Sequence, residues 1–412
     1  MKLSRREVTK LLLAASMSPK SLGQSSPSPA KSTSDVVVIG AGVFGAWTAY
    51  SLRQAGLRVT LVDSYGPSNS RASSGGESRI IRASYGADDF YSRWVLRSLP
   101  RWQELSNRSE SPVFHKTGVL FLSDGSTDIV KQSAAALNRL GVTFEQLSSS
   151  DLKKQFPQIA FQENDSAILE PNSGALMARR AVQTLVAEMI GQGLDYHQAF
   201  VAPHAKSGKL SAIKTSTGEE ISGGCFIFAC GPWLPKLFPA LLGNYIKPER
   251  AEVYFLGVPA GDSRFAPPQM PTWIHSSREW DAYGMPDLEN RGFKVAVDKI
   301  SLPADPDTLD REPTPAFLQH VRAFIAMRFP ALKNAPVLET RVCQYEYTPS
   351  GNYIIDRHPD FENVWIVGGG SGHGFKNGPA VGEYVTELIT KNAQLEPQLT
   401  ISSQRNPTHR VD

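Results

Sequence analysis

Two patterns of apolar and polar positions run through the chain. Uninterrupted apolar runs at 36–39 and 364–367 are typical of strands that are buried on both faces, as in a parallel sheet, and 58–62 is a further strand-like run. The runs at 253–258 and 292–298 are also strand-like. Together the patterns predict an α/β (α+β) fold.

The first buried run continues into a glycine turn. Residues 35–63 read DVVVIGAGVFGAWTAYSLRQAGLRVTLVD, which predicts a strand, a turn Gly40-x-Gly42-x-x-Gly45, a helix and a second strand that ends on Asp63. Gly40 permits the tight turn, Gly42 lets a diphosphate approach the backbone, and Gly45 packs the helix on the strand. Free N–H groups at the helix start suit phosphates, and the acid suits ribose hydroxyls. The stretch therefore predicts a Rossmann-like dinucleotide site.

The sequence after this unit distinguishes FAD from NAD. An NAD domain continues into another strand–helix unit, whereas 64–86 is rich in Gly and Ser, contains three arginines and is typical of a loop over a ligand. Two later segments, 223–233 and 364–378, again place glycines directly after a buried strand. A cofactor contacted by three sequence-distant segments must be long, so we expect FAD.

The N-terminus has the features of a targeting signal. Arg5 and Arg6 precede a short apolar run at 11–17, and Ser/Pro-rich sequence follows to residue 34. This arrangement resembles a bacterial twin-arginine signal and predicts export to the periplasm, with the folded protein beginning near Asp35. The alternative is a disordered basic tail.

Composition excludes several classes of function. The formal net charge is +3, but the first 32 residues carry six Lys/Arg and one Glu, which leaves about −2 for the remainder. This balance argues against nucleic acid as the main partner. No stretch approaches the ~20 apolar residues of a membrane span, and no Cys/His spacing is typical of a metal site. The 412 residues predict two domains or one large divided domain.

Further motifs point to a family. Besides the glycine turn they are GESRIIRASYG (76–86), KTGVLFL (116–122), EPNSGALM (170–177), CGPW (230–233), RVCQYE (341–346), YIIDRHP (353–359) and GSGHGFK (370–376). With them, the chain resembles the monomeric sarcosine oxidase and N-methyltryptophan oxidase-like branch of the D-amino-acid-oxidase-like FAD-dependent oxidoreductases. The resemblance covers nearly all of 34–393.

The resemblance implies a discontinuous architecture. The expected order is a signal and linker at 1–33, a Rossmann-like FAD-binding domain at 34–112, 172–247 and 338–393, an antiparallel-sheet substrate domain at 113–171 and 248–337, and a tail at 394–412. The expected cofactor contacts are Gly40, Gly42, Val43, Phe44, Gly45, Asp63, Ser64, Ser78, Arg79, Val201, Gly231, Trp233, Cys343, Gly370, Gly372, Gly374 and Lys376.

Lys294 receives opposite interpretations from pattern and family. Alternation places it on the strand face opposite Phe293, Val295 and Val297, and the pattern alone predicts that this face is solvated. The resemblance implies instead that Lys294 lies beside the flavin, where a fixed cation stabilises superoxide as oxygen is reduced.

For one of the three cysteines, too, the residues alone and the resemblance give different expectations. Cys225 and Cys230 are five residues apart, roughly 16 Å in a strand, and point to opposite faces, so we expect small buried side chains and no disulfide. From the sequence alone, we expect Cys343 to be a buried structural cysteine. The resemblance implies instead that it forms a thioether to the 8α-methyl carbon of the flavin. Arg341, if it points inward, favours the required thiolate.

The glycine-rich segment 368–378 surrounds one lysine. Its glycines let the backbone lie against the flavin, and a helix expected from Pro379 directs its N-terminus at the ring. The resemblance implies that Lys376 and Arg82 hold a substrate carboxylate, with Arg79 nearer the flavin. We expect His373 to be structural, bonding the backbone.

The implied reaction is oxidation of a carbon–nitrogen bond by FAD, with peroxide formed from oxygen. Tyr283 and Tyr345 match tyrosines that shape the pocket. Asp298 stands where the sarcosine enzyme has a histidine, and Ser74-Gly75 replaces a His-His pair, so the substrate need not be N-methylglycine.

We therefore expect an FAD-dependent oxidase of a carboxylate-bearing secondary amine or N-methyl amino acid, acting as a monomer. Three alternatives stay open. One is a dehydrogenase that passes electrons to a quinone, and another is an oxidase of a cyclic or sugar-modified amino acid. The third is a flavin-carrying binding factor without turnover.

Overall fold

The computed structural model describes residues 33–201, 207–298, 302–405 and 407. The contacts of the chain separate Met1–Thr33 from Ser34–Asp412, and the fold is that of the second unit. The predicted twin-arginine signal, with Arg5 and Arg6, lies outside the described residues. Within them, no helix combines the length and the apolar character needed to cross a membrane.

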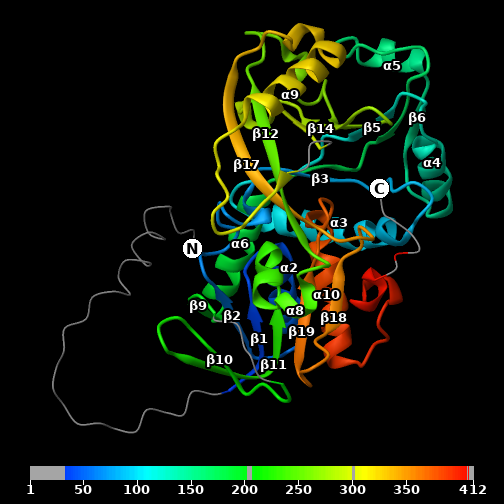
Figure 1. The fold of residues 1–412 in the computed structure, drawn as a ribbon. Helices are drawn as coiled ribbons and strands as arrows, with labels where there is room; N and C mark the ends of the chain where they lie inside the picture. Colours follow the sequence, from blue (N-terminus) through cyan, green and yellow to red (C-terminus); the bar gives the residue numbers. More distant parts are fainter. Residues whose placement is uncertain (1–32, 202–206, 299–301, 406, 408–412) are drawn as a thin grey trace. The chain divides into compact units, whose positions relative to one another are not determined.

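Most of the buried runs meet in one sheet (Figure 1). Among the described residues its seven strands are, in order, β18 (Ile354–Arg357), β19 (Val364–Gly368), β11 (Glu220–Phe228), β1 (Ser34–Ile39), β2 (Val59–Asp63) and β9 (Asp195–Gln198), with β10 (Ala212–Lys214) beside β11. The strands β19, β11, β1, β2 and β9 are parallel, and β18 and β10 pair antiparallel to their neighbours.

The central strand β1 is buried on both faces, as its apolar run predicts. Val36 and Val38 join one core cluster, and Val37 and Ile39 join another. From β1 the chain proceeds to β2 on one side, while β11 lies on the other side. In such sheets a ligand binds beyond the carboxyl ends of the strands, where the strand order reverses.

Most of the remaining strands form a second sheet. Across the described residues it has nine strands, in the order β16 (Leu302–Pro303), β12 (Lys247–Leu256), β15 (Phe293–Val297), β14 (Asp281–Met285), β13 (Thr272–Ser276), β5 (Val119–Ser123), β7 (Ser166–Glu170) and β6 (Glu145–Leu147), with β17 (Val337–Tyr347) beside β12. A three-stranded sheet joins β3 (Arg79–Ile81), β8 (Gly174–Leu176) and β4 (Phe114–His115).

The described helices are α2 (Val43–Gln54), α3 (Phe90–Arg108), α4 (Ile129–Arg139), α5 (Ser149–Gln155), α6 (Ala178–Gly191), α7 (Leu234–Leu237), α8 (Pro239–Leu242), α9 (Pro315–Arg328) and α10 (Gly378–Thr390). Residues of α2, α3, α6 and α10 share a core cluster with one face of the seven-stranded sheet. Pro379 lies in the first turn of α10, where its missing N–H costs nothing, so the expected helix start is confirmed.

The two faces of the nine-stranded sheet have different partners. Phe293, Val295 and Val297 belong to a core cluster with residues of α9. The opposite face carries Lys294 and Tyr283, and cross-strand pairing of β12 with β15 and β17 places Cys343 on that face as well. This second face therefore brings together side chains that are far apart in the sequence.

The predicted fold class is confirmed, with two differences of detail. The strand pair β5–β13 is parallel, so the second sheet is mixed and not wholly antiparallel. Residues 338–347, which the sequence assigns to the FAD-binding part, pair along β12 in the nine-stranded sheet (Figure 1). Strand pairing depends on partners that are remote in the chain, which local patterns do not reveal.

Candidate active site

A cavity lies at the carboxyl ends of the parallel strands. It encloses about 1350 Å³ of empty space, including its open mouth. The ends of β1, β2, β11 and β19 contribute to its wall, as do the loop after β2 and the end of β17. Its position matches the site expected from the reversal of strand order.

The glycine turn has the geometry that its pattern predicts. Gly40 has a φ of +104°, and a Cβ atom there would lie 2.3 Å from the carbonyl oxygen of Ala229. A Cβ at Gly45 would lie 1.8 Å from the Gly40 oxygen, so α2 packs directly on the turn. At Gly42 a Cβ would meet only Ser74 Oγ, at 3.5 Å, which leaves the backbone open to a ligand.

Most of the predicted cofactor residues line this cavity. They are Gly40, Gly42, Val43, Phe44, Asp63, Ser64, Arg79, Val201, Gly231, Trp233, Gly370, Gly372 and Gly374, and Tyr345 joins them. The other candidates do not line the cavity and belong to packing contacts and hydrogen-bond networks instead. They are Gly45, Ser78, Cys343, Lys376, Arg82, Lys294 and Tyr283. The cofactor contacts that the resemblance implies therefore gather mostly in one cavity.

One group of side chains surrounds Arg79 and is called the Arg79 cluster; it comprises Arg79, Ser78, Lys294 and Cys343. The guanidinium of Arg79 donates to the Ser78 and Ser73 carbonyl oxygens at 2.8 and 2.6 Å, and lies 3.5 Å from Cys343 Sγ. Burial opposes its charge, but the ionisable groups around it, first Cys343, hold the pKa of Arg79 above its ordinary value. The cation is therefore retained inside the protein.

Lys294 is the second cation of this cluster. Its side chain is 2% exposed, so the interpretation of its face as solvated is wrong. Its Nζ donates to the carbonyl oxygen and the hydroxyl of Ser78, at 2.8 and 3.1 Å. Burial, and then the charge of Arg79, hold the pKa of Lys294 well below its ordinary value. The family resemblance therefore places this lysine better than the strand pattern does.

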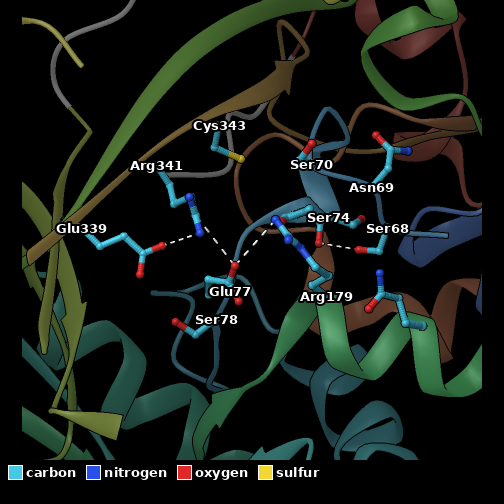
Figure 2. Close-up of polar contacts among 12 residues, drawn as sticks. Ser68, Asn69, Ser70, Ser74, Glu77, Ser78, Arg179, Glu339, Arg341 and Cys343 are labelled. Carbon is cyan, nitrogen blue, oxygen red and sulfur yellow. Dashed lines mark hydrogen bonds and ion pairs between the residues drawn. The ribbon is translucent and has the colours of Figure 1, made fainter. Parts of the chain in front are cut away.

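Arg341 does not contact the thiol of Cys343. Figure 2 shows its guanidinium turned toward Glu339 and Glu77, to which it is ion-paired at 2.5 and 3.8 Å. The cation next to the sulfur belongs to Arg79. The condition under which Arg341 would favour a thiolate, that it points inward, is therefore not met, because two carboxylates hold its guanidinium.

The two tyrosines expected in the pocket contact each other. Tyr283 and Tyr345 share a hydrogen bond of 2.7 Å between their hydroxyls. Asp298 is hydrogen-bonded to Tyr345, and burial, followed by the charge of Asp281, raises the pKa of Asp298 to about 8. Near neutral pH this acid is therefore largely uncharged and able to donate a proton in a hydrogen bond.

A second group surrounds Arg82 and is called the Arg82 cluster; it comprises Arg82, Tyr85, His373 and Lys376. Lys376, only 5% exposed, donates to the Tyr85 hydroxyl at 2.7 Å and to the His373 carbonyl at 3.1 Å. Arg82 lies over the same tyrosine ring, 4.7 Å from its centroid, and also over Phe121 at 4.8 Å. The structure thus brings the two predicted carboxylate-binding residues to one aromatic ring.

Among the described residues no carboxylate forms an ion pair with Arg82 or Lys376, and Glu170 acts on Lys376 only through its charge. Nη1 of Arg82 is buried and has no hydrogen-bond partner among the described residues. Burial, and then the charge of Arg82, hold the pKa of Lys376 well below its ordinary value. A buried guanidinium nitrogen that is left unpaired is costly, so the cluster is suited to an added anion.

His373 is held by its neighbours, as the structural interpretation expects. Its Nε2 lies 3.0 Å from the Gly351 carbonyl, and its Nδ1 lies 3.1 Å from the Tyr353 hydroxyl. Burial, and then the charge of Lys376, lower the pKa of His373 to about 3. The imidazole is therefore neutral and adds no charge to the cluster.

Sequence reasoning missed three polar residues at the site. Tyr85 contacts both cations of the Arg82 cluster, and Glu170, 1% exposed, accepts from the backbone N–H groups of residues 83 and 84. Glu346 lines the cavity with a buried oxygen that has no partner in the segments that the structure describes. All three belong to motifs quoted above, and a buried acid at the end of a strand is the signal that could have found two of them.

The cysteines behave as expected in part. Cys225, Cys230 and Cys343 are all free, and Cys225 and Cys230 pack against different core clusters. Burial raises the pKa of Cys225 to about 12 and that of Cys230 higher still, so neither is a ready nucleophile.

The cavity fits a flavin dinucleotide. The open backbone at Gly42 and the start of α2 suit a diphosphate, although Ser74 Oγ already accepts from the Val43 N–H at 3.0 Å. Asp63 accepts from the Ala41 and Tyr65 N–H groups, and the wall also carries unpaired polar atoms, including Ser73 Oγ. Within the described residues no group of three or more His, Cys, Asp or Glu side chains is placed to hold a metal ion.

Fold and site together define a protein that binds a dinucleotide at a parallel sheet, next to one face of a second sheet. The model of the family described as DAO, FAD dependent oxidoreductase, matches residues 35–388. The chain belongs to this family of FAD-dependent oxidoreductases, so the predicted family and cofactor are confirmed.

Individual relatives agree. The chain is 31% identical to the monomeric sarcosine oxidase of Bacillus sp. (strain B-0618) over 385 residues, with 90% of this chain and 96% of the relative covered. It is 29% identical to the N-methyl-L-tryptophan oxidase of Salmonella agona, covering 86% and 94%. Among solved structures, L-proline dehydrogenase from P. horikoshii is similar in fold, with a TM-score of 0.78 at 24% identity and coverage of 92% of this chain and 99% of the other.

Proposed function

We propose that this protein oxidises the carbon–nitrogen bond of a carboxylate-bearing secondary amine or N-methyl amino acid. The named relatives support an amino acid as substrate, since they include sarcosine and N-methyl-L-tryptophan oxidases. The Arg82 cluster carries the proposal, because Arg82 and Lys376 meet at one ring and Nη1 of Arg82 is buried with no partner in the described part of the chain. A planar guanidinium and an ammonium together suit a carboxylate.

In the proposed reaction FAD, when bound, accepts the two electrons of the substrate as a hydride or its equivalent. The residues of the chain position the substrate and control charge. Lys376 and Arg82 hold the carboxylate, which fixes the adjacent amine relative to the cavity. Lys376 is protonated when the anion binds, because the negative charge offsets the burial and the repulsion that lower its pKa.

The Arg79 cluster supplies the cofactor side of the site. We propose that Cys343 attaches the flavin covalently and that Arg79, whose guanidinium lies 3.5 Å from its sulfur, helps to position the sulfur for this attachment. Lys294 is the cation proposed to stabilise negative charge when oxygen is reduced, which makes oxygen the electron acceptor. Peroxide is then the second product.

Asp298 bears on the choice of amine. It is bonded to Tyr345 next to Tyr283, and its raised pKa of about 8 makes it a hydrogen-bond donor near neutral pH. We propose that these three side chains recognise the substituent on the substrate nitrogen or α-carbon. An uncharged carboxyl group can contact either a small alkyl substituent or a polar one. The screen described below therefore decides which amine is preferred.

Two further proposals concern the whole chain. Arg5 and Arg6, followed by a short apolar run, support export of the folded, cofactor-loaded protein by the twin-arginine route. Changing both to lysine should retain the protein in the cytoplasm of a bacterial host, and unchanged export would contradict the proposal. The protein is proposed to act as a monomer, which light scattering of the purified protein tests.

The central experiment is an anaerobic screen of amino acids, N-methyl amino acids and matched amines without a carboxylate. Bleaching of the flavin absorbance by the carboxylate-bearing compounds, followed by peroxide formation in air, is expected. Bleaching without peroxide, and with rapid reoxidation by a quinone, would make the protein a dehydrogenase. Equal bleaching by an amine and its carboxylated counterpart would contradict the role of the Arg82 cluster.

A further inference from the structure

Glu346 is a buried acid that the fold does not explain. It lies near the end of β17, its side chain is 8% exposed, and it lines the cofactor cavity. Its Oε1 accepts only one long hydrogen bond, 3.4 Å from the Gly370 N–H, and its Oε2 is buried with no partner among the described residues. The buried acids Asp165 and Glu252, in contrast, are each paired with an arginine.

The unpaired oxygen points to a ligand. A carboxyl group that loses water without gaining a partner destabilises the folded protein, and such groups are rare in native structures. The glycine at position 231 keeps space for this oxygen, because a Cβ there would lie 2.9 Å from Glu346 Oε2. The surrounding chain therefore accommodates a polar atom and yet leaves it without a partner.

The place of Glu346 along the cavity selects the part of the cofactor. Gly42 and Asp63 line the cavity at the glycine turn and at the end of β2, and they suit the diphosphate and the ribose. Tyr345, the residue before Glu346, also lines the cavity and bonds Tyr283 on the face that carries Lys294. Glu346 contacts the loops that follow β11 and β19, and the Cys230 thiol beside it is influenced by both Asp63 and Glu346. Glu346 is therefore linked to the tyrosine pair of the second sheet on one side and to Asp63 on the other.

Between the ring and the diphosphate, FAD has a polyol chain. A carboxylate next to a diphosphate would be repelled, and the apolar face of the ring offers it no hydrogen bond. A hydroxyl group, in contrast, donates to an ionised carboxylate and accepts from a protonated one. We propose that Glu346 binds a hydroxyl of the polyol chain through Oε2 and so positions the flavin.

The ionisation of the side chain fits this role. Burial, opposed only in part by the Gly370 N–H, raises the pKa of Glu346 to about 7. Both forms are then populated near neutral pH, and a hydroxyl satisfies either one. The proposal rests on membership of the FAD-dependent family and not on the identity of the amine.

Binding measurements on apoprotein in a Cys343→Ser background test the proposal, since the cofactor then exchanges freely if Cys343 is the attachment point. The probes are FAD, riboflavin, lumiflavin, which has the ring without the polyol chain, and ADP. Glu346→Leu should weaken FAD and riboflavin roughly tenfold, as expected for one hydrogen bond to a partly charged group, and leave lumiflavin and ADP unchanged. Glu346→Gln, which keeps the shape and a hydrogen bond, should lose much less.

A matched control comes from the same strand. Gln344 is buried two residues before Glu346 and also has an unpaired oxygen, but it donates to the Arg71 carbonyl. Gln344→Leu should not distinguish riboflavin from lumiflavin. If Glu346→Leu does not fold, deoxyribityl analogues of riboflavin on the Cys343→Ser parent give the same information, since one missing hydroxyl should account for the loss. Unchanged FAD affinity in Glu346→Leu, or equal losses for riboflavin and lumiflavin, would overturn the proposal.

Discussion

The two clusters of cations at the site are built from the same kinds of residue and differ in how their charges are satisfied. In the Arg79 cluster, the arginine and Lys294 donate to backbone carbonyls and to Ser78 at 2.6 to 3.1 Å. In the Arg82 cluster, the guanidinium lies between two aromatic rings and has a buried nitrogen without a partner. One cluster is complete in the protein alone, and the other is not.

This difference teaches what each cluster is for. Cations that are already paired with carbonyls are held in position and gain little from a further anion, so they suit a permanent cofactor and charge that develops during reaction. A buried cation without a partner gains most from an anion that comes and goes. The comparison supports the proposal that Arg79 and Lys294 serve the flavin and oxygen, and that Arg82 and Lys376 serve the substrate.

The largest expected effect is at the thiol of the complete cluster. Cys343→Ser should abolish covalent attachment, because serine is a far weaker nucleophile toward the flavin ring. After acid precipitation the parent protein should stay yellow, and the variant should release all its FAD. Release of all flavin from the parent itself would contradict the covalent link and leave Cys343 as a packing residue beside Arg79.

The next effect tests the cation of that cluster. Lys294→Met should slow reoxidation of the reduced protein by oxygen roughly a hundredfold, the typical cost of losing one preorganised electrostatic group. Anaerobic reduction by substrate should change little, because the substrate carboxylate is held elsewhere. Stopped-flow absorbance separates the two steps, and equal losses in both would show that Lys294 has another task.

Substitutions in the Arg82 cluster should weaken the binding of substrate. Arg82→Met and Lys376→Met should each weaken binding of substrate and carboxylate inhibitors ten- to hundredfold, since charge-assisted bonds contribute roughly 1.5–3 kcal/mol each. The flavin content should be unchanged. Amides of the same inhibitors serve as controls and should be affected much less. If the parent protein oxidises an amine without a carboxylate as well as its best amino acid, the proposed role of the Arg82 cluster is contradicted.

The same cluster should bind carboxylates in a pH-dependent manner. Lys376 has a lowered pKa in the free protein, Glu170 offsets this only in part, and neutral His373 adds no charge. A bound carboxylate raises the pKa of Lys376, so binding takes up a proton. The affinity for benzoate should therefore be highest and constant below the pKa that Lys376 has in the free protein. Above that pKa it should decline by at most about tenfold per pH unit, because one proton is taken up. Lys376→Met should remove this dependence.

The smallest effect is expected between the tyrosines. Tyr283→Phe removes one hydrogen bond of 2.7 Å to Tyr345 and leaves the ring in place. A neutral hydrogen bond contributes about 1 kcal/mol, so kcat/KM should fall about fivefold, with flavin reoxidation unaffected. A loss as large as that of Arg82→Met would mean that the hydroxyl itself takes part in the chemistry.

Local signals in the sequence were enough to predict the first strand–turn–helix–strand unit and the start of the last helix. The buried run at 36–39 and the glycine turn from Gly40 predict β1, the turn and α2, because each step depends on residues only a few positions apart. The same holds for Asp63 at the end of β2 and for the start of α10 at Pro379. Their side-chain periodicity and backbone requirements are visible in a single window of sequence.

Tertiary structure decided what these elements do with their charges. Strand alternation separates Lys294 from Phe293, but only the packing of the second sheet on the site makes its face buried. Nearness in sequence favoured Arg341 as the partner of Cys343, whereas the fold supplied Arg79 from 264 residues away. Burial and pairing depend on contacts between distant segments. The sequence alone therefore determined the glycine turn, and the three-dimensional fold decided which cations are fully paired and which one, Arg82, keeps a buried nitrogen without a partner among the described residues.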